Sequence, residues 1–155
     1  MWNGKKKAVT FSFDDGVKQD EHAIEILDKY GLKATFNLNS AVLGAKSEGV
    51  EKGIFVRYDK AEPQRVKEIY KNHEVASHTL QHHNLVYLSE EDILVQVNED
   101  IQRLSELVGY EVRGFAYPCG EVNNDDRTAE VLRTKTPVRY ARTIHASHSF
   151  DICKN

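Results

Sequence analysis

The chain has 155 residues, of which 40% are hydrophobic and 29% are charged, a balance typical of a globular protein with one domain over residues 1–155. A formal net charge of −3 argues against a general nucleic-acid-binding protein, which usually carries a basic face. No stretch is long and apolar enough to span a bilayer, and the apolar run at residues 8–13 is too short for a secretory leader. We therefore expect a cytoplasmic protein without membrane contact, or an extracytoplasmic one if a leader has been removed.

The first third of the chain contains two predicted strands separated by a helix. Residues 7–13 are apolar and rich in β-forming side chains and stop at Asp14, which indicates a buried strand that ends in a turn. Apolar side chains at helical spacing predict a helix over residues 18–30, and a second strand follows over residues 33–39. The segment 40–62 contains several glycines and no clear periodicity, so we interpret it as an irregular loop.

The remaining predicted elements again alternate between helix and strand. The clearest is a helix over residues 89–108, because Ser89 and Asp92 form a capping-box-like start, apolar residues mark one face, and Gly109 ends it. In chain order, the elements after the loop are a helix over 63–71, a strand over 74–77, the helix over 89–108, a strand over 112–117, a helix over 126–133 and a strand over 139–144. This alternation predicts an α/β fold with a mainly parallel sheet, in which the loops after the strands meet at one end and carry the chemistry.

Polar side chains follow two of the predicted strands. Asp14 and Asp15 are usually just a turn before glycine, but adjacent carboxylates also suit a metal site in which one binds the cation and the other accepts a proton from water. His78 and His82 are four residues apart, which would place both imidazoles on one face if the segment is helical; the simpler interpretation is two surface histidines, as for the neighbouring His83. Two imidazoles and one carboxylate, with coordination positions left open, match a catalytic metal site better than a closed structural one.

Three segments together resemble the polysaccharide deacetylase (NodB-homology) family. The first is TFSFDDG at residues 10–16, the second is HTLQH at residues 78–82, and the third is RGFAYPCG at residues 113–120. Their order and spacing also fit the family, and the resemblance covers the chain from about Ala8 to Gly120. It implies a distorted (β/α) barrel.

The resemblance also implies a role for each matching residue. Asp14 would be the general base, Arg113 would pair with it and orient it, and the backbone N–H of Tyr117 would help to form an oxyanion hole. The resemblance further implies a divalent metal ion, zinc first and cobalt, nickel or manganese as alternatives. Its ligands would be Asp15, His78 and His82.

The implied activity is that of a metal-dependent hydrolase that removes acetyl groups from N-acetylated or O-acetylated carbohydrate by attack of a metal-activated water. Two alternatives stay open. One is a catalytically impaired relative that binds a metal or a carbohydrate without turnover. The other is a hydrolase of a small non-peptide amide on a related α/β scaffold.

The chain departs from the family after Gly120. The family's later motifs, which include a Leu-x-His segment whose histidine protonates the leaving group and an aspartate that tunes it, have no counterpart there. We therefore expect a barrel that is incomplete at the C-terminus, with an exposed sheet edge that a homo-oligomer would cover. The proton would come from a segment outside this chain, from His145 or His148, or from Asp14 returning the proton it accepted.

Overall fold

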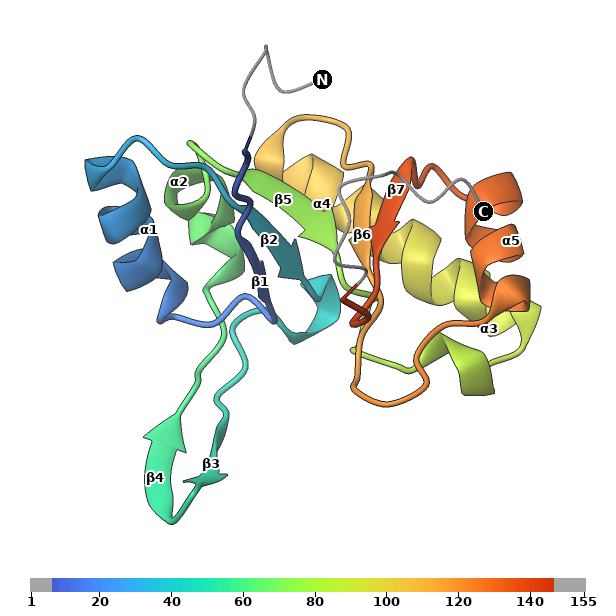
Figure 1. Cartoon of the computed structure of the whole chain (residues 1–155), viewed down its shortest axis with the longest axis horizontal. Helices are drawn as coiled ribbons and strands as arrows, with labels where there is room; N and C mark the ends of the chain where they lie inside the picture. The colour runs from blue at the N-terminus through green and yellow to red at the C-terminus, as the bar shows by residue number, and fades with distance from the viewer. Residues whose placement is uncertain (1–6, 147–155) are drawn as a thin grey trace.

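The computed structural model describes residues 7–146, and its main feature is a five-stranded parallel sheet (Figure 1). Neighbouring strands lie in the order β1-β2-β5-β6-β7. Because every pair is parallel, the carboxyl ends of all five strands lie at the same end of the sheet. The strands are β1 (Ser12–Asp14), β2 (Thr35–Leu38), β5 (Glu74–Ser77), β6 (Gly114–Ala116) and β7 (Tyr140–Arg142). The predicted α/β fold with a parallel sheet is confirmed.

Helices connect the strands and cover the sheet. They are α1 (Asp20–Lys29), α2 (Val66–Ile69), α3 (Glu90–Leu94), α4 (Asp100–Val108) and α5 (Asp126–Lys135). Helix α4 packs on β5, and α3 packs against α5 (Figure 1). Short 3₁₀ turns occur at Ser40–Val42, Pro63–Arg65 and Leu85–Tyr87.

The core lies between the sheet and these helices. Phe36 in β2 is fully buried, stacks on Phe13 of β1 with ring centroids 5.1 Å apart, and contacts Tyr70 at the end of α2 at 5.0 Å. Full burial of a phenylalanine stabilises a fold by roughly 1.5–3 kcal/mol. This aromatic group therefore ties the first two strands to α2.

The first predicted strand is shorter and less buried than expected. Strand β1 covers Ser12–Asp14, within and just past the predicted residues 7–13, and its side chains are exposed or half-buried. The reason is its position: β1 is the first strand in the sheet order and pairs only with β2. The prediction of a buried strand is wrong, although the strand and the turn after it are present.

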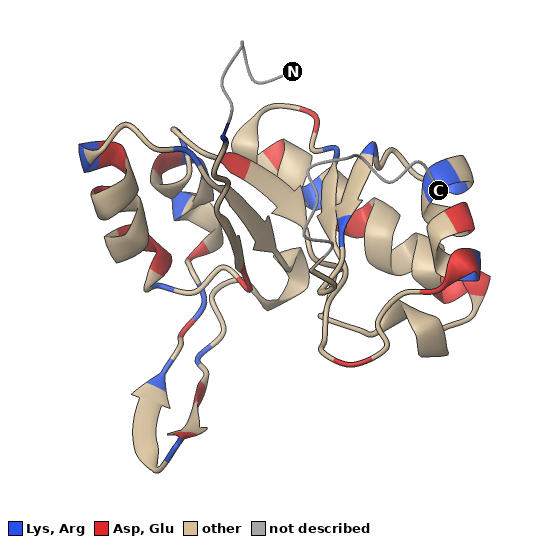
Figure 2. Cartoon of the chain, in the orientation of Figure 1, with Lys and Arg blue, Asp and Glu red and all other residues tan. Residues whose placement is uncertain are grey.

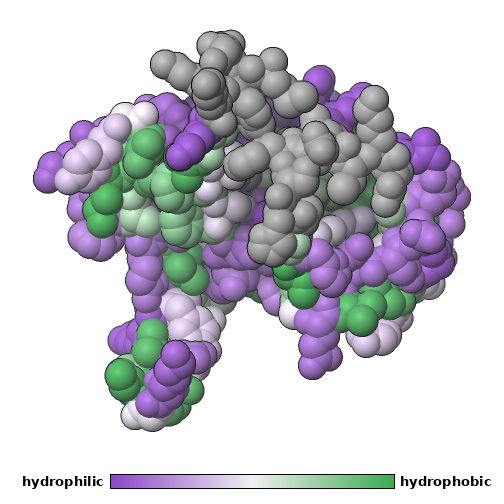
Figure 3. Space-filling view, in the orientation of Figure 1, coloured by the Kyte–Doolittle hydropathy of each residue, from purple (hydrophilic) through white to green (hydrophobic). Residues whose placement is uncertain are grey.

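The segment predicted as an irregular loop contains a β-hairpin that projects from the body of the molecule (Figure 1). Strands β3 (Glu48–Glu51) and β4 (Ile54–Arg57) pair with each other in antiparallel fashion. The turn between them consists of Lys52 and Gly53, both with positive φ (50° and 81°), as a tight two-residue hairpin turn requires. Three large apolar side chains are exposed on the hairpin: Val50, Ile54 and Phe55. Figure 3 shows green, hydrophobic atoms on this projecting part of the molecule.

The helix predicted over residues 89–108 is present but interrupted. Ser89 caps α3 by accepting the Asp92 N–H, and Gly109 ends α4 with φ 84°, as predicted. Between α3 and α4 the chain forms a π-helical turn, Val95–Glu99, which the sequence pattern did not indicate. Such turns occur frequently at functional sites.

Charged residues of both signs lie along the described part of the chain (Figure 2). Figure 2 shows acidic and basic residues over the helices, the hairpin and the loops, while the strands of the sheet are mostly uncharged. Within residues 7–146, no helix is long and apolar enough to cross a membrane.

Candidate metal centre and active site

The turn after β1 places Asp15 at the carboxyl end of the sheet. Asp15 and Gly16 both have positive φ, 77° and 59°, a conformation that aspartate tolerates and glycine adopts freely. The Asp15 N–H donates to the Asn37 carbonyl of β2 at 2.9 Å, which anchors the turn. A Cβ at Gly16 would lie 2.8 Å from a methyl carbon of Leu38, so both the positive φ and the close approach of this turn to β2 favour glycine.

His78 directly follows β5 and is held rigidly. Its side chain is 3% exposed, and its Nδ1 lies 2.8 Å from the Ala116 carbonyl in β6, to which it donates. That bond leaves Nε2 free and fixes the orientation of the ring. Burial lowers the pKa of His78, so the imidazole is neutral at pH 7, which is the form that binds a metal.

His82 reaches the same point through a loop and not through a helix. Thr79 and His82 have φ values of 65° and 63°, which are incompatible with an α-helix. The segment is therefore not helical, and the loop brings the two rings together instead, with centroids 4.9 Å apart. His82 is 39% exposed on its side chain, so this side of the site is open to solvent.

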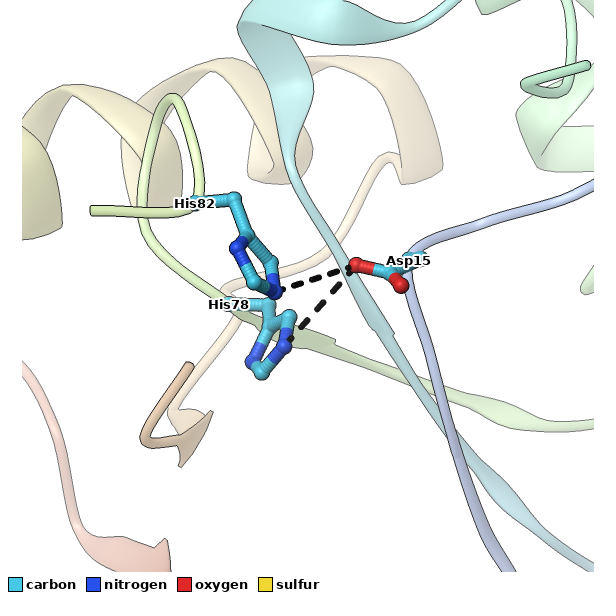
Figure 4. Close-up of side chains that lie close together, drawn as sticks. All are labelled: Asp15, His78 and His82. Atoms are coloured by element: carbon cyan, nitrogen blue, oxygen red, sulfur yellow. Dashed lines mark ion pairs between the residues drawn. The ribbon is translucent and has the colours of Figure 1, made fainter. Parts of the chain in front are cut away.

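The structure brings together the three side chains predicted as metal ligands, as Figure 4 shows. Asp15 Oδ1 lies 3.4 Å from His82 Nε2 and 4.0 Å from His78 Nε2, and one ligand atom from each residue lies within 4.8 Å of the others. Tetrahedral zinc with ligands at 2.0–2.1 Å separates its donor atoms by about 3.3 Å. The nitrogen and oxygen donors and their spacing therefore fit a divalent metal after small side-chain adjustments.

Asp14 lies beside this group without belonging to it. Its Oδ1 accepts a hydrogen bond from the Asn37 side-chain amide at 2.8 Å. Both carboxylate oxygens also accept from Nη2 of Arg142, at 2.5 and 2.6 Å. Asp14 is thus fixed by β2 on one side and by β7 on the other.

Two of the predicted catalytic contacts are corrected by the structure. Arg113 pairs with the exposed Glu111, and Arg142 takes the place beside Asp14 that was predicted for Arg113. The physical reason is position along the strands. Arg113 precedes the amino end of β6, whereas Arg142 lies at the carboxyl end of β7, which is the end of the sheet at which Asp14 also lies. The N–H of Tyr117 donates to the Arg142 carbonyl at 3.0 Å, so it is not free to face an oxyanion.

Other residues near the site were missed or left open by the sequence. Lys60, 13% exposed on its side chain, places Nζ 3.9 Å from Asp15 Oδ1. Burial raises the pKa of the Cys119 thiol, whose sulfur lies 3.9 Å from His82 Nδ1, so Cys119 is a protonated neighbour of this ring. His145 is exposed, and His148 lies outside the described residues.

The sequence profile of the family described as polysaccharide deacetylase matches residues 2–136, most of the chain. The chain belongs to the polysaccharide deacetylase family. A comparison with curated proteins finds no significant match.

Solved polysaccharide deacetylase structures resemble this one in fold. A deacetylase from Streptococcus pyogenes, determined in complex with acetate, is 22% identical with a TM-score of 0.69, and the match covers 84% of this chain and 53% of that one. A polysaccharide deacetylase from Bacillus cereus is 20% identical with a TM-score of 0.71, covering 90% of this chain and 40% of that one. A pseudoenzyme of the same class from Bacillus anthracis is 22% identical with a TM-score of 0.64, covering 83% and 41%.

These comparisons show the distorted barrel fold that the sequence motifs implied. The parallel sheet described above corresponds to part of that barrel, since the chain spans about half or less of the length of these solved structures.

Proposed function

We propose that the chain is the metal-binding part of a deacetylase that hydrolyses acetyl groups on carbohydrate, with N-acetylated sugars as the first substrate class and O-acetyl esters as the second. The observation that carries the proposal is the arrangement of Asp15, His78 and His82 around one point, with Asp14 held beside them. Membership of the polysaccharide deacetylase family supports it.

Asp15, His78 and His82 would hold the metal, with zinc as the first candidate. A bound divalent ion supplies a Lewis acid that polarises a carbonyl group and acidifies water. The protein's contribution is to fix these side chains, which it does through the turn after β1 and the loop after β5. The solvent-exposed side of His82 and Asp15 provides access for substrate.

Asp14 would act as the general base that takes a proton from the attacking water. Its carboxylate is held by Arg142 and Asn37, which leaves it little rotational freedom. Because the base is already held in one orientation, the reaction does not have to restrict its rotation, which lowers the entropic part of the activation barrier. When the tetrahedral intermediate collapses, the protonated Asp14 can return this proton to the departing amine or alcohol.

The proposal is tested by acetate release from N-acetylglucosamine oligosaccharides with and without added zinc. Asp14→Asn should retain zinc, measured by titration calorimetry, and lose roughly 10²–10⁴-fold in rate. His78→Ala should lose zinc binding itself. Full activity of Asp14→Asn would show that the base is another residue.

A second candidate is a relative that binds metal or carbohydrate without turnover. The observation that favours it is the similarity in fold to the Bacillus anthracis pseudoenzyme. It predicts zinc binding that depends on His78, with no acetate released from any acetylated sugar. Zinc-dependent acetate release by this chain would exclude it.

A further inference from the structure

The loop that carries both histidines has an unfavourable backbone. Thr79 is β-branched and has φ 65°, and His82 has φ 63°. Side chains other than glycine rarely adopt such a conformation, and it persists only where surrounding contacts enforce it. The contacts that enforce it therefore set the position of both imidazoles.

The first set of contacts comes from the π-helical turn between α3 and α4. The carbonyl of Gln96 accepts the Leu80 N–H at 2.8 Å, a bond that points out of the helix to the loop. The Gln96 side chain accepts the Gln81 N–H at 3.1 Å through Oε1 and donates to the Gln81 side chain at 3.1 Å through Nε2. One residue of the π turn thus holds the two central residues of the loop.

The second set comes from Asp100, which begins α4 immediately after the π turn. Asp100 is completely buried, and its two carboxylate oxygens accept from different segments: Oδ1 from the Ser40 N–H at 2.7 Å and Oδ2 from the Ser77 hydroxyl at 2.6 Å. Ser77 immediately precedes His78. Next to Ser40, the Asn39 side-chain amide donates to the backbone carbonyls of His78 and of Thr79.

A buried carboxylate is costly unless its hydrogen bonds compensate, and a π turn interrupts an otherwise regular helix. Both features face the same loop. From these contacts we propose that Gln96 and Asp100 are positioning residues that hold the 78–82 loop in the shape required for metal binding. The inference rests on the proposed metal centre and deepens it.

The test uses substitutions that remove these contacts. Asp100→Ala removes both acceptor oxygens, and Gln96→Met removes the side-chain bonds to Gln81 with little change in volume. Matched controls are Asp126→Ala and Gln102→Met, which make the same chemical changes at exposed helical positions. Val108→Ala, a buried change at the far end of α4, controls for lost stability.

Two properties of the metal-free proteins are measured: zinc affinity by calorimetry and amide hydrogen exchange of Ser40, Leu80 and Gln81. We expect the Asp100 and Gln96 variants to lose roughly 10–100-fold in zinc affinity, the usual effect of removing groups that orient ligands. Exchange should accelerate at Gln81 in Gln96→Met and at Ser40 in Asp100→Ala. The controls should stay within about twofold of the wild type in affinity.

Folded variants with wild-type zinc affinity, or with unchanged exchange, would overturn the proposal. An equal loss of affinity in Val108→Ala at the same melting temperature would also overturn it, because stability alone would then be the cause. If Asp100→Ala does not fold, Ser77→Ala removes only the Ser77 bond and should weaken zinc binding in the same direction.

Failure of the metal centre itself would look different. If the wild type binds no zinc, the proposed function fails, and the exchange data alone decide this inference. Faster exchange in the variants would then uphold the positioning of the loop, and unchanged exchange would reject it.

Discussion

Arg142 is the residue on which the orientation of Asp14 most depends. It contacts both carboxylate oxygens and reaches them from the carboxyl end of β7. The same reasoning that identifies Asp14 and His78, namely that polar residues at the carboxyl ends of parallel strands carry chemistry, applies to Arg142 in the predicted strand 139–144. The resemblance to the family motif favoured Arg113 instead. A match between sequence motifs does not show at which end of a strand an arginine lies, or which carboxylate it contacts.

Arg142→Ala should reduce the rate of acetate release by about tenfold to a hundredfold and leave zinc affinity unchanged. The estimate is at the low end for a general base because Asn37 still holds one oxygen of Asp14. Arg113→Ala is the matched control and should remain within about twofold of the wild type, since its partner is the exposed Glu111. Equal losses in the two variants would contradict the assignment.

Gly16→Ala should destabilise the protein by about 2–5 kcal/mol, measured by urea unfolding. A side chain at φ 59° costs about 1–2 kcal/mol, and the new Cβ would approach Leu38 at 2.8 Å, adding roughly 1–3 kcal/mol of overpacking. Gly31→Ala separates the two effects, because Gly31 has φ 65° but open space around it. A loss in Gly16→Ala no larger than in Gly31→Ala would show that the turn relaxes away from Leu38.

At the scale of single elements, the sequence was least informative where structure depends on contacts between distant segments. The π turn at Val95–Glu99 lies inside a regular apolar repeat, and its carbonyl at Gln96 is directed to the loop after β5. Nothing in the local sequence distinguishes that turn from an ordinary helical one. The hairpin did carry a local signal, the Lys52-Gly53 turn between residues that include Val50 and Phe55, but the alternation around it is weak.

The hairpin should be dispensable for folding and for zinc binding. The Tyr58 N–H donates to the Ser47 carbonyl at 2.9 Å, so a two-residue Asn-Gly turn can join these positions and replace residues 48–57. A two-stranded hairpin is at best marginally stable by itself, so removing it should shift the melting temperature by no more than a few degrees. Zinc affinity should stay within about threefold, and a shortened protein that is folded but no longer binds zinc would show that the hairpin supports the site.

At the scale of the whole molecule, alternation of strands and helices was enough to predict the parallel sheet. Parallel strands need crossover connections, and those connections place the carboxyl ends of β1 and β5 at the same end of the sheet. Asp15, His78 and His82 could therefore be grouped from the sequence before any distance was known. The pairing of Arg142 with Asp14 could not be predicted in this way. It depends on the place of β7 in the sheet, where it pairs with β6.

The stability of the whole fold should depend on the titration of Asp20. This residue lies in the first turn of α1, is 4% exposed, and accepts a hydrogen bond from the Tyr70 hydroxyl at 2.8 Å, which links α1 to the end of α2. Burial is the main cause that raises the pKa of Asp20 from 3.8 to about 6. The folded protein thus binds this proton more tightly than the unfolded chain does.

The sign follows from that difference. The stabilisation from the protonated carboxyl is fully present below about pH 4 and is lost as the pH rises through about 6. Asn at this position can still accept from Tyr70 and does not titrate. The free energy of unfolding of Asp20→Asn minus that of the wild type should therefore increase by up to about 3 kcal/mol between pH 4 and pH 7.5. Urea unfolding at several pH values measures this difference in the free energy of unfolding, with the exposed Asp126→Asn as the matched control. A difference that does not change with pH would contradict the prediction. It would mean that Asp20 is ionised in the folded protein and that the Tyr70 hydrogen bond and nearby charges outweigh the effect of burial.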